Sequence, residues 1–214
     1  MKLTPNKIEE YAKQHTKVYD SSVLDRLERK THLEVMRPQM LSGYLQGQFL
    51  AFFSKMKQPK AILEIGTYTG YSAICLAQGL QQNGVLHTID INKELEAIAT
   101  EYIHQAGVDD RIIQHQGNAL EIIPTIDKQW DLIFLDADKI NYSQYYDMVL
   151  PKLKIGGVII ADNVLWHGKV VEGSREKRAS ALAVFNKKVT EDDRVDNVLL
   201  PLRDGLMLIE KKSD

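Results

Sequence analysis

Acidic side chains, an amide and a lysine follow two apolar runs of the sequence, in a pattern that could carry out chemistry. The stretch "LIFLDADKINY" at 132–142 ends one run with Asp136, Asp138 and Lys139, and "IIADNVLWHG" at 159–168 ends another with Asp162 and Asn163. Two carboxylates and an amide oxygen suit a hard cation such as Mg²⁺, or Mn²⁺ or Ca²⁺ in its place. A lysine beside that cation could take up a proton or steady a negative oxygen. Asp138 could support the ligands or lie in solvent.

A second set of residues has the pattern of a nucleoside-binding site. In "LEIGTYTGYS" at 63–72, Glu64 precedes a turn where Gly66 lets the backbone approach a ligand. The Gly-x-x-x-Gly spacing is not the G-x-G-x-x-G of dinucleotide sites, and the acid opposes a pyrophosphate but suits a cation. Asp90 could bind both ribose hydroxyls, and "QGNAL" at 116–120 could flank an adenine. A nucleoside with a positive group in place of phosphate is S-adenosylmethionine.

All these residues follow strand-like runs that alternate with segments of helical period. The alternation indicates βα units in a doubly wound, mostly parallel α/β sheet, whose ligands bind at the carboxyl ends of the strands. Asp136 and Asp162 are then expected on neighbouring strands, about 5 Å apart. The predicted strands lie near 61–65, 85–90, 111–115, 131–136 and 157–162, and the predicted helices begin near Thr69, Asn92, Asn118 and Asn141.

The two ends of the chain have different patterns. "VDNVLLPL" at 195–202 and "LMLIEKK" at 206–212, joined by "RDG", predict an antiparallel hairpin that completes a seven-stranded, Rossmann-like sheet. Residues 1–58 are predicted to form a helical cover, with a helix start at Thr4-Pro5 and helical spacing in "SGYLQGQFLAFFSKM" at 42–56. Residues 59–214 are the predicted sheet core, and 1–214 is predicted to be a single domain.

The composition excludes several classes of protein. A net charge of -2 over 214 residues gives no general attraction to nucleic acid or to a membrane. One cysteine, Cys75, rules out an internal disulfide framework, and its place in "SAICLAQGL" predicts a core residue. The start "MKLTPNKIEE" lacks the apolar run of a signal peptide, so we expect a cytoplasmic location.

Four ordered motifs, "LEIGTYTGYS", "TIDIN", "FLDADKINY" and "ADNVLWHG", resemble the metal-dependent catechol and caffeoyl-coenzyme A O-methyltransferases, in a bacterial form, from about Met36 to the C-terminus. The resemblance implies a homodimeric enzyme that uses S-adenosylmethionine and a divalent cation to methylate a vicinal dihydroxy-aromatic. It implies catalytic roles for Lys139, as base, and Asp136, and substrate contacts from Trp166 and His167. The implied metal ligands are Asp136, Asp162 and Asn163. The implied cofactor-binding residues are Met40, Ser42, Glu64, Gly66, Ser72, Asp90, Asn118, Ala119 and Asp136.

The chemistry of this expectation is simple. A cation lowers the pKa of a chelated hydroxyl, and the resulting phenolate attacks the sulfonium methyl in line. Opposite charges partly cancel in that transition state, so alignment and exclusion of water should matter most. Two positions depart from the family pattern: Pro201 stands where the catechol enzymes have a carboxylate, and His167 replaces an asparagine usual in the caffeoyl-coenzyme A branch.

Three alternatives stay open on the sequence alone. Methylation of a hydroxylated wobble uridine in transfer RNA would use the same cofactor and metal sites, but it needs a basic surface near the pocket. The second alternative, a nicotinamide-dependent oxidoreductase, is disfavoured because the sequence lacks the G-x-G-x-x-G fingerprint of such enzymes. The third, a binding module without catalysis, would leave Lys139 without a role. The residues that could provide the basic surface are Lys152, Lys154, Lys169, Arg175, Lys177 and Arg178.

Overall fold

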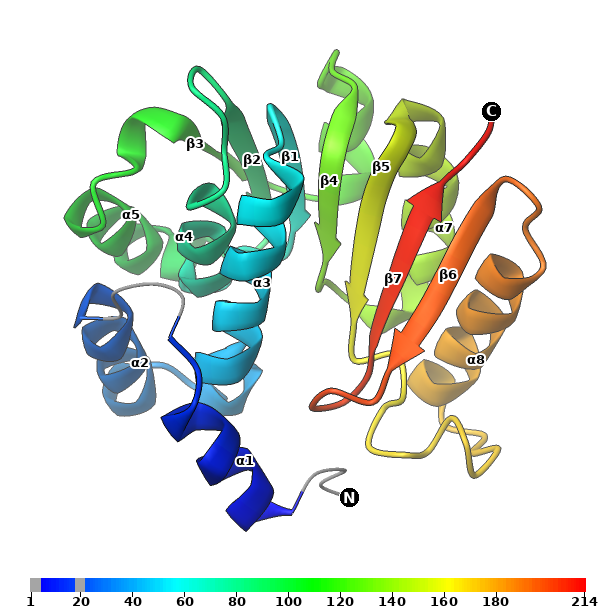
Figure 1. The fold of residues 1–214 in the computed structure, drawn as a ribbon, viewed down its shortest axis with the longest axis horizontal. Coiled ribbons are helices and arrows are strands. Elements are labelled where there is room, and N and C mark those ends of the chain that lie inside the picture. Colours follow the sequence, from blue (N-terminus) through cyan, green and yellow to red (C-terminus); the bar gives the residue numbers. More distant parts are fainter. Residues whose placement is uncertain (1–4, 18–21) are drawn as a thin grey trace.

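The protein is built on one twisted sheet with helices on both faces. The computed structural model describes residues 5–17 and 22–214, and the sheet in these ranges has seven strands in the order β3-β2-β1-β4-β5-β7-β6 (Figure 1). β1 to β5 pair in parallel, and β7 is antiparallel to both β5 and β6. The strands are β1 (Ala61–Ile65), β2 (Val85–Asp90), β3 (Ile112–Gln116), β4 (Trp130–Leu135), β5 (Leu153–Asp162), β6 (Val195–Leu200) and β7 (Leu206–Lys211).

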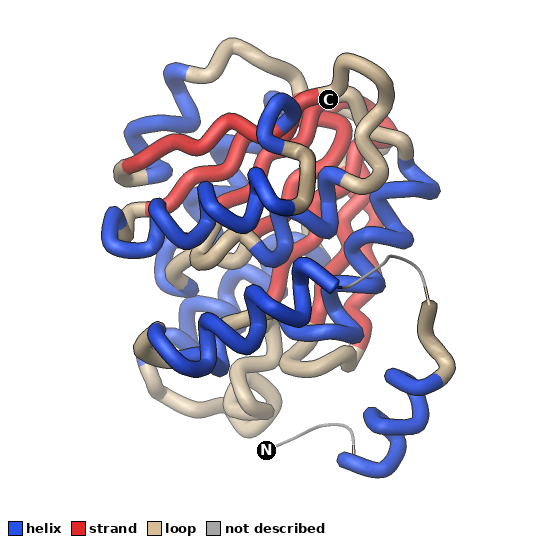
Figure 2. The backbone as a smooth tube through the Cα atoms, turned by 90° about the vertical axis from the view of Figure 1, so that its left-hand side faces the viewer, coloured by secondary structure: helices blue, strands red, loops and turns tan. Residues whose placement is uncertain are grey.

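Helices cover the sheet on its two faces, which Figure 2 shows nearly edge-on. The helices are α1 (Asn6–Gln14), α2 (Ser22–Glu34), α3 (Gly43–Lys57), α4 (Tyr71–Ala77), α5 (Glu96–Gln105), α6 (Ala119–Ile122), α7 (Tyr142–Val149) and α8 (Lys177–Thr190). Short 3₁₀ turns lie at Pro38–Met40, Lys93–Leu95, Asp109–Arg111, Ile123–Thr125, Lys139–Asn141 and Leu150–Lys152. None of the helices in the described ranges is long and apolar enough to cross a bilayer.

Two hydrophobic cores, one on each face, hold these layers together. Leu63, Ile133 and Ile159 point to the face covered by α7 and α8, where Tyr146 and Phe185 are fully buried. The next residue along each strand points to the opposite face, which α2, α3, α4 and α5 cover. The strands are therefore apolar on both sides, as expected for a parallel sheet between helices. Cys75 is fully buried in this second core, as predicted.

The predicted fold class is confirmed, and most element boundaries shift by one or two residues. Asn118 and Asn141 directly precede α6 and α7, Asn92 caps a 3₁₀ turn before α5, and α4 begins at Tyr71 rather than near Thr69. α3 forms as predicted, whereas the start of the N-terminal helix falls partly outside the described residues, since Thr4 is not described and α1 begins at Asn6.

Two boundaries differ for a physical reason. β5 begins at Leu153, four residues before the predicted start, because Gly156 (φ +75°) and an irregular register opposite β4 let the strand pass through two glycines without ending. The hairpin connection spans residues 201–205 rather than the "RDG" alone. Pro201 has no N–H to give to a strand partner, and Arg203 (φ +53°) and Gly205 (φ +90°) turn the chain.

Candidate active site

The predicted cation ligands lie at the tips of two neighbouring strands. β4 and β5 are paired in parallel up to Leu135 opposite Ala161, so that Asp136 and Asp162 come together at the carboxyl edge of the sheet. The loop that follows β5 and the β6–β7 turn reach the same edge, the lower one in Figure 1. Asp162 is almost fully buried, with 2% of its surface exposed. The adjacency expected from the sequence is therefore present.

Lys139 lies against Asp136, three residues earlier, at the start of the 3₁₀ turn Lys139–Asn141. Its Nζ donates to Oδ1 of Asp136 at 2.7 Å and to the hydroxyl of Tyr142 at 2.6 Å. The Tyr142 hydroxyl lies 3.0 Å from the carbonyl oxygen of Leu135 and 2.9 Å from that of Asp162, so this one phenolic oxygen contacts the ends of both β4 and β5. Tyr142 was not predicted to have a role. Its only sequence signal is its position three residues after the lysine, on the same side of a helical turn.

A glutamine of the N-terminal cover reaches the same carboxylates. Gln46, on α3, donates from Nε2 to Oδ2 of Asp162 at 2.6 Å, and the backbone N–H of Asn163 donates to Oδ1 at 2.7 Å. Burial raises the pKa of Asp136 to about 6. The positive charge of Lys139 acts to lower this pKa, and the carboxylate of Asp162 acts to raise it. Two buried carboxylates with this mutual repulsion have the charge and the oxygen atoms that a divalent cation requires.

The described residues do not hold a ready-made acidic metal cluster. Among residues 5–17 and 22–214, no three His, Cys, Asp or Glu side chains gather where they could hold a metal ion. The predicted ligand set contains two such side chains, with the amide of Asn163 as the third. Asn163 itself has left-handed backbone (φ +60°), a conformation that asparagine tolerates better than most residues. The cation remains a prediction.

Glu64 is a buried acid with an unpaired oxygen. Its side chain is fully buried near the end of β1, Oε2 accepts from the hydroxyl of Thr88 at 2.5 Å, and Oε1 has no hydrogen-bond partner among the described residues. Burial raises its pKa to about 8, although the hydroxyls of Ser72 and Thr88 act to lower it. An unsatisfied buried oxygen costs free energy, which a cationic donor from a ligand would recover. This feature fits the ammonium-bearing end of S-adenosylmethionine.

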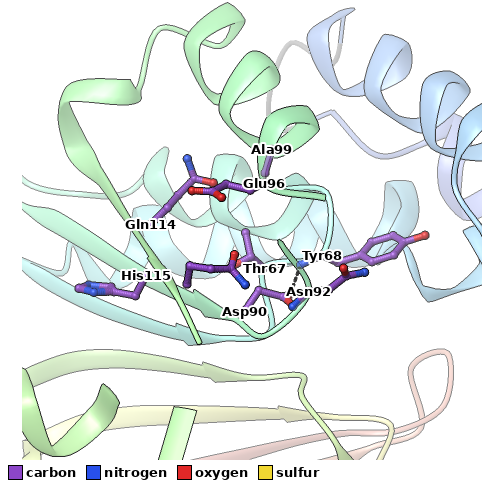
Figure 3. A pocket seen from close by; sticks show the side chains of 9 residues that line it. Thr67, Tyr68, Asp90, Asn92, Glu96, Ala99, Gln114 and His115 are labelled. Atoms are coloured by element: carbon purple, nitrogen blue, oxygen red, sulfur yellow. Dashed lines mark hydrogen bonds between the residues drawn. The ribbon is translucent and has the colours of Figure 1, made fainter. Parts of the chain in front are cut away.

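Asp90 is held rigidly at the tip of β2. Its Oδ2 accepts the backbone N–H of Tyr68 at 2.7 Å, and its Oδ1 accepts that of Asn92 at 2.8 Å. A small pocket opens here between the ends of β1 and β2, α5 and β3, and Figure 3 shows Thr67, Tyr68, Asp90 and Asn92 close together on its wall. The carboxylate therefore keeps free acceptor positions toward a pocket, as binding of ribose hydroxyls requires.

The glycine turn has a structural task besides ligand approach. Gly66 has φ +109°, and a Cβ at this position would lie 2.2 Å from the backbone oxygen of Asp136. Its N–H donates to Ile89 while the N–H of Asp136 donates to Ile65, so the turn is locked between β2 and β4. Ser72 is buried on the first turn of α4, beside Glu64.

Asn118 and Ala119 lie next to Asp90 through the backbone. The N–H of Gly117 donates to the carbonyl of Asp90 at 2.8 Å, and the Asn118 side chain accepts the N–H of Leu120 at 3.1 Å as the cap of α6. Ala119, the first residue of α6, is buried. The three successive strand tips thus bring together the residues predicted to bind the nucleoside.

Met40 and Ser42 lie at the entrance to α3. Met40 ends a 3₁₀ turn and is 54% exposed, whereas Ser42 directly precedes α3 and is 5% exposed. The carbonyl of Ser42 accepts a hydrogen bond from the guanidinium of Arg203 in the β6–β7 turn. The cover is thereby tied to the far side of the site.

Trp166 and His167 project from the loop after β5, both with left-handed backbone (φ +47° and +55°). The indole Nε1 of Trp166 donates to Glu176 at 2.9 Å, and the guanidinium of Arg178 lies 5.7 Å from the ring centre. The N–H of His167 donates to Oδ1 of Asp204 at 2.5 Å. These contacts hold the Trp166 indole and the His167 backbone in the loop that follows Asp162, while the His167 side chain is exposed.

Asp204, in the β6–β7 turn, is a carboxylate near the site that the sequence pattern did not predict. Burial raises the pKa of Asp204; the His167 N–H and ring act to lower it, Asp162 acts to raise it and Lys139 to lower it. The β6–β7 turn therefore carries a carboxylate that interacts electrostatically with Asp162 and Lys139, three residues after Pro201, where the catechol enzymes have theirs. Asp138, in contrast, is exposed and accepts hydrogen bonds from Tyr145 and Asn141, so it shapes the start of α7.

The basic residues considered for RNA do not form one surface. Lys154 lies near the amino end of β5, about 25 Å along the strand from Asp162, and Lys152 directly precedes that strand. Lys152 donates to two backbone carbonyls, and Lys154 pairs with Asp131 at 2.7 Å. Lys169 pairs with Glu176. Lys152 and Lys154 therefore lie at the far end of the sheet, whereas the other four, Lys169, Arg175, Lys177 and Arg178, belong to the loop after β5 and the start of α8.

A sheet of order 3-2-1-4-5-7-6, with a buried acid near the end of the first strand and a second acid as the last residue of the next, is that of the Rossmann-like methyltransferases. The model of the O-methyltransferase family matches residues 14–212, and the chain belongs to that family. This membership excludes the nicotinamide-dependent oxidoreductase and the non-catalytic module considered above.

Individual relatives agree with this assignment. The chain is 36% identical over 179 residues to a caffeoyl-CoA O-methyltransferase of Medicago sativa, covering 78% of this chain and 72% of that protein. Its fold matches that of a Podospora anserina methyltransferase solved with SAH bound (TM-score 0.89, 28% identity, 97% and 95% of the two chains). It also matches the O-methyltransferase TomG of Streptomyces achromogenes, solved in complex with SAM (TM-score 0.88, 28% identity, 97% of each chain).

Proposed function

We propose that this O-methyltransferase uses S-adenosylmethionine and a divalent cation, Mg²⁺ or in its place Mn²⁺ or Ca²⁺, to methylate one hydroxyl of a catechol-like or caffeoyl-like vicinal dihydroxy-aromatic. The observation that carries the proposal is the convergence of Asp136, Lys139 and Asp162 at two paired strand tips, one strand away from Glu64. It supports a site in which a methyl donor and a chelated acceptor lie side by side.

The donor side depends on fixed polar atoms. Glu64 binds the positively charged end of the donor with its unpaired Oε1, and Asp90 accepts the ribose hydroxyls while backbone N–H groups of Tyr68 and Asn92 hold it still. Asn118 and Ala119 flank the base, and Met40 and Ser42 close over the methionine part. S-adenosylmethionine supplies the electrophilic methyl group.

The acceptor side depends on the strand tips. Asp136, Asp162 and Asn163 would hold the cation, which lowers the pKa of an acceptor hydroxyl when it is bound. Lys139 directs two N–H groups of Nζ at Asp136 and Tyr142, which leaves its third position for the acceptor oxygen. As a neutral amine it would take the hydroxyl proton on its lone pair there, and as an ammonium it would donate a third N–H to the negative oxygen. Trp166, which is half-buried, and His167, which is exposed, orient the aromatic ring at the mouth of the site.

The test is transfer of a labelled methyl group to a panel of catechols and to undermodified transfer RNA, with and without EDTA. We expect transfer to catechols that EDTA abolishes and Mg²⁺ restores, and loss of transfer in Asp162→Ala. Activity that survives both EDTA and Asp162→Ala would refute the cation. Transfer to RNA alone would favour the wobble-uridine alternative, whose basic surface would have to come from residues 169–178 without Lys152 and Lys154.

We also propose that the protein is a cytoplasmic homodimer, joined through the sheet face beside α3. Apolar side chains on this face are exposed: Phe52 (53%), Met56 (72%) and Val198 (49%). Val198, Leu208 and Ile160 form one row across β6, β7 and β5, and Figure 1 shows no helix of the described residues in front of β7 and β6. Exposed apolar surface of this kind is typical of interfaces.

Light scattering after size exclusion tests the dimer. Val198→Glu should yield monomers, whereas Val184→Glu, which changes an equally apolar exposed residue (62%) on α8, should leave the dimer intact. A monomeric native protein would refute the proposal.

A further inference from the structure

Gln46 holds a predicted cation ligand although it lies outside the sheet. It is fully buried on the first turn of α3, and its Nε2 donates to Oδ2 of Asp162 at 2.6 Å across 116 positions of sequence. The second oxygen of Asp162 accepts the N–H of Asn163. The carboxylate is therefore gripped by one donor from its own loop and one from the N-terminal cover.

The orientation of the Gln46 amide is set by Arg203. The guanidinium of Arg203 lies 3.1 Å from Oε1 of Gln46, and a guanidinium can only donate. The amide must therefore present its oxygen to Arg203 and its NH₂ group to Asp162. A reversed amide would face Asp162 with an acceptor and Arg203 with a donor, so both contacts would become repulsive.

The same guanidinium also binds the cover where it reaches the cofactor site. Arg203 donates to the carbonyl of Ser42, which directly precedes α3. Ser42 and Gln46 lie one helical turn apart, on a segment that includes Met40. If the first turn of α3 shifts when S-adenosylmethionine binds, the Gln46 amide that holds Asp162 therefore moves with it.

We propose that Gln46 is a positioning residue that orients Asp162 for the cation and, with Arg203 and Ser42, couples cation binding to cofactor binding. The inference rests on the proposed function, since it needs a cation at Asp162. Supporting groups behind a metal ligand typically change metal affinity 10- to 100-fold. Coupling between two sites is reciprocal, so each ligand should strengthen binding of the other by the same factor.

Calorimetric titration of Mn²⁺ into the full-length protein, with and without S-adenosylhomocysteine, tests the inference without measuring activity. In the native protein, Mn²⁺ should bind roughly 5-fold or more tightly when S-adenosylhomocysteine is present. Gln46→Met, which keeps the length of the side chain and removes its hydrogen bonds, should weaken Mn²⁺ binding by about 10- to 100-fold and reduce the coupling factor to about 1.

Two further variants make the outcome decisive. Gln48→Met changes the other buried glutamine of α3 and should leave Mn²⁺ affinity and coupling as in the native protein. Arg203→Asn suits the left-handed backbone but is too short to reach Gln46, so it should abolish the coupling even if Gln46→Met does not fold. The inference would be overturned, and the proposed function left intact, if Gln46→Met bound Mn²⁺ with native affinity and Arg203→Asn kept the native coupling factor. No Mn²⁺ binding by the native protein would overturn both.

Discussion

The ammonium of Lys139 lies 2.7 Å from Oδ1 of Asp136, so the predicted base and the predicted cation ligand form one buried ion pair. Lys139 is 7% exposed and Tyr142 also accepts from its Nζ. Because the Lys139 side chain is buried and held by two partners, the pair is positioned by its surroundings before any substrate arrives, while the Asp136 side chain stays 20% exposed. Its orientation toward an acceptor is thus part of the folded structure.

Replacement of Lys139 should abolish most catalysis without preventing cofactor binding. We expect Lys139→Met to lower kcat by about 10²- to 10⁴-fold, the usual contribution of a positioned proton-transfer group. Lys139→Arg separates the two possible roles, since an arginine stays protonated and can steady a phenolate but cannot take up a proton. Affinity for S-adenosylhomocysteine, measured by calorimetry, is the control and should stay near the native value. A Lys139→Met enzyme within tenfold of native kcat would contradict the role.

Glu64 should make the ligand-free protein less stable as the pH rises. Its pKa in the folded state is about 8, above its ordinary value of 4.5, so the folded protein holds a proton that the unfolded chain has lost. This stabilisation is complete below pH 4.5 and is lost as the pH rises through 8. We expect roughly 3–5 kcal/mol less stability at pH 8.5 than at pH 5 from this group, measured by urea unfolding.

The Glu64→Gln variant is the control for that pH dependence, since it cannot titrate. Subtracting its unfolding free energy at each pH removes the contributions of Asp136 and the histidines. Equal pH profiles for the two proteins would show that Glu64 is ionised in the ligand-free fold.

A histidine pair should make the protein sensitive to acid. Nδ1 of His87 lies 2.8 Å from Nε2 of His115, and one edge of Trp130 packs against the His87 ring. Burial lowers the pKa of His87 to about 4, and His115 and Lys128 act in the same direction. The unfolded chain therefore binds the extra proton first, so stability present above pH 6.5 is lost as the pH falls toward 4.

We expect this loss to be roughly 1–3 kcal/mol, and His87→Gln should flatten the unfolding free energy between pH 6.5 and pH 4. The exposed His32 is the matched control, since His32→Gln should keep the native acid profile. A native-like profile in His87→Gln would contradict the assignment.

The loop that carries Trp166 and His167 should depend on Gly205. Gly205 has φ +90°, and a Cβ there would lie 2.6 Å from Cγ of Leu165, while its carbonyl accepts the N–H of Val164 at 3.2 Å. We expect Gly205→Ala to cost roughly 2–4 kcal/mol of unfolding free energy and to raise the KM for the acceptor more than that for the cofactor. Gly173→Ala, with a similar φ of +68° but nothing within 4 Å, should cost only about 1 kcal/mol. Equal effects of the two changes would show that the contact with Leu165 is unimportant.

The sequence by itself determined the sheet, its strand tips and the residue types placed there. Apolar runs that end in Glu64, Asp90, Asp136 and Asp162 are local patterns, and parallel βα units put every such end on one edge. The convergence of these acids could therefore be predicted from the topology of parallel βα units. The four ordered motifs were enough to predict the family.

Only the tertiary structure decided which distant groups hold those acids. Gln46 meets Asp162 across 116 positions, and Arg203 meets Ser42 across 161, contacts that depend on how α3 and the β6–β7 turn pack. It likewise decided that Glu64 is wholly buried with one unpaired oxygen, and that Lys152 and Lys154 lie far from the site. Periodicity shows the face of an element on which a side chain lies. The partner it meets depends on the packing of whole elements, which no local pattern contains.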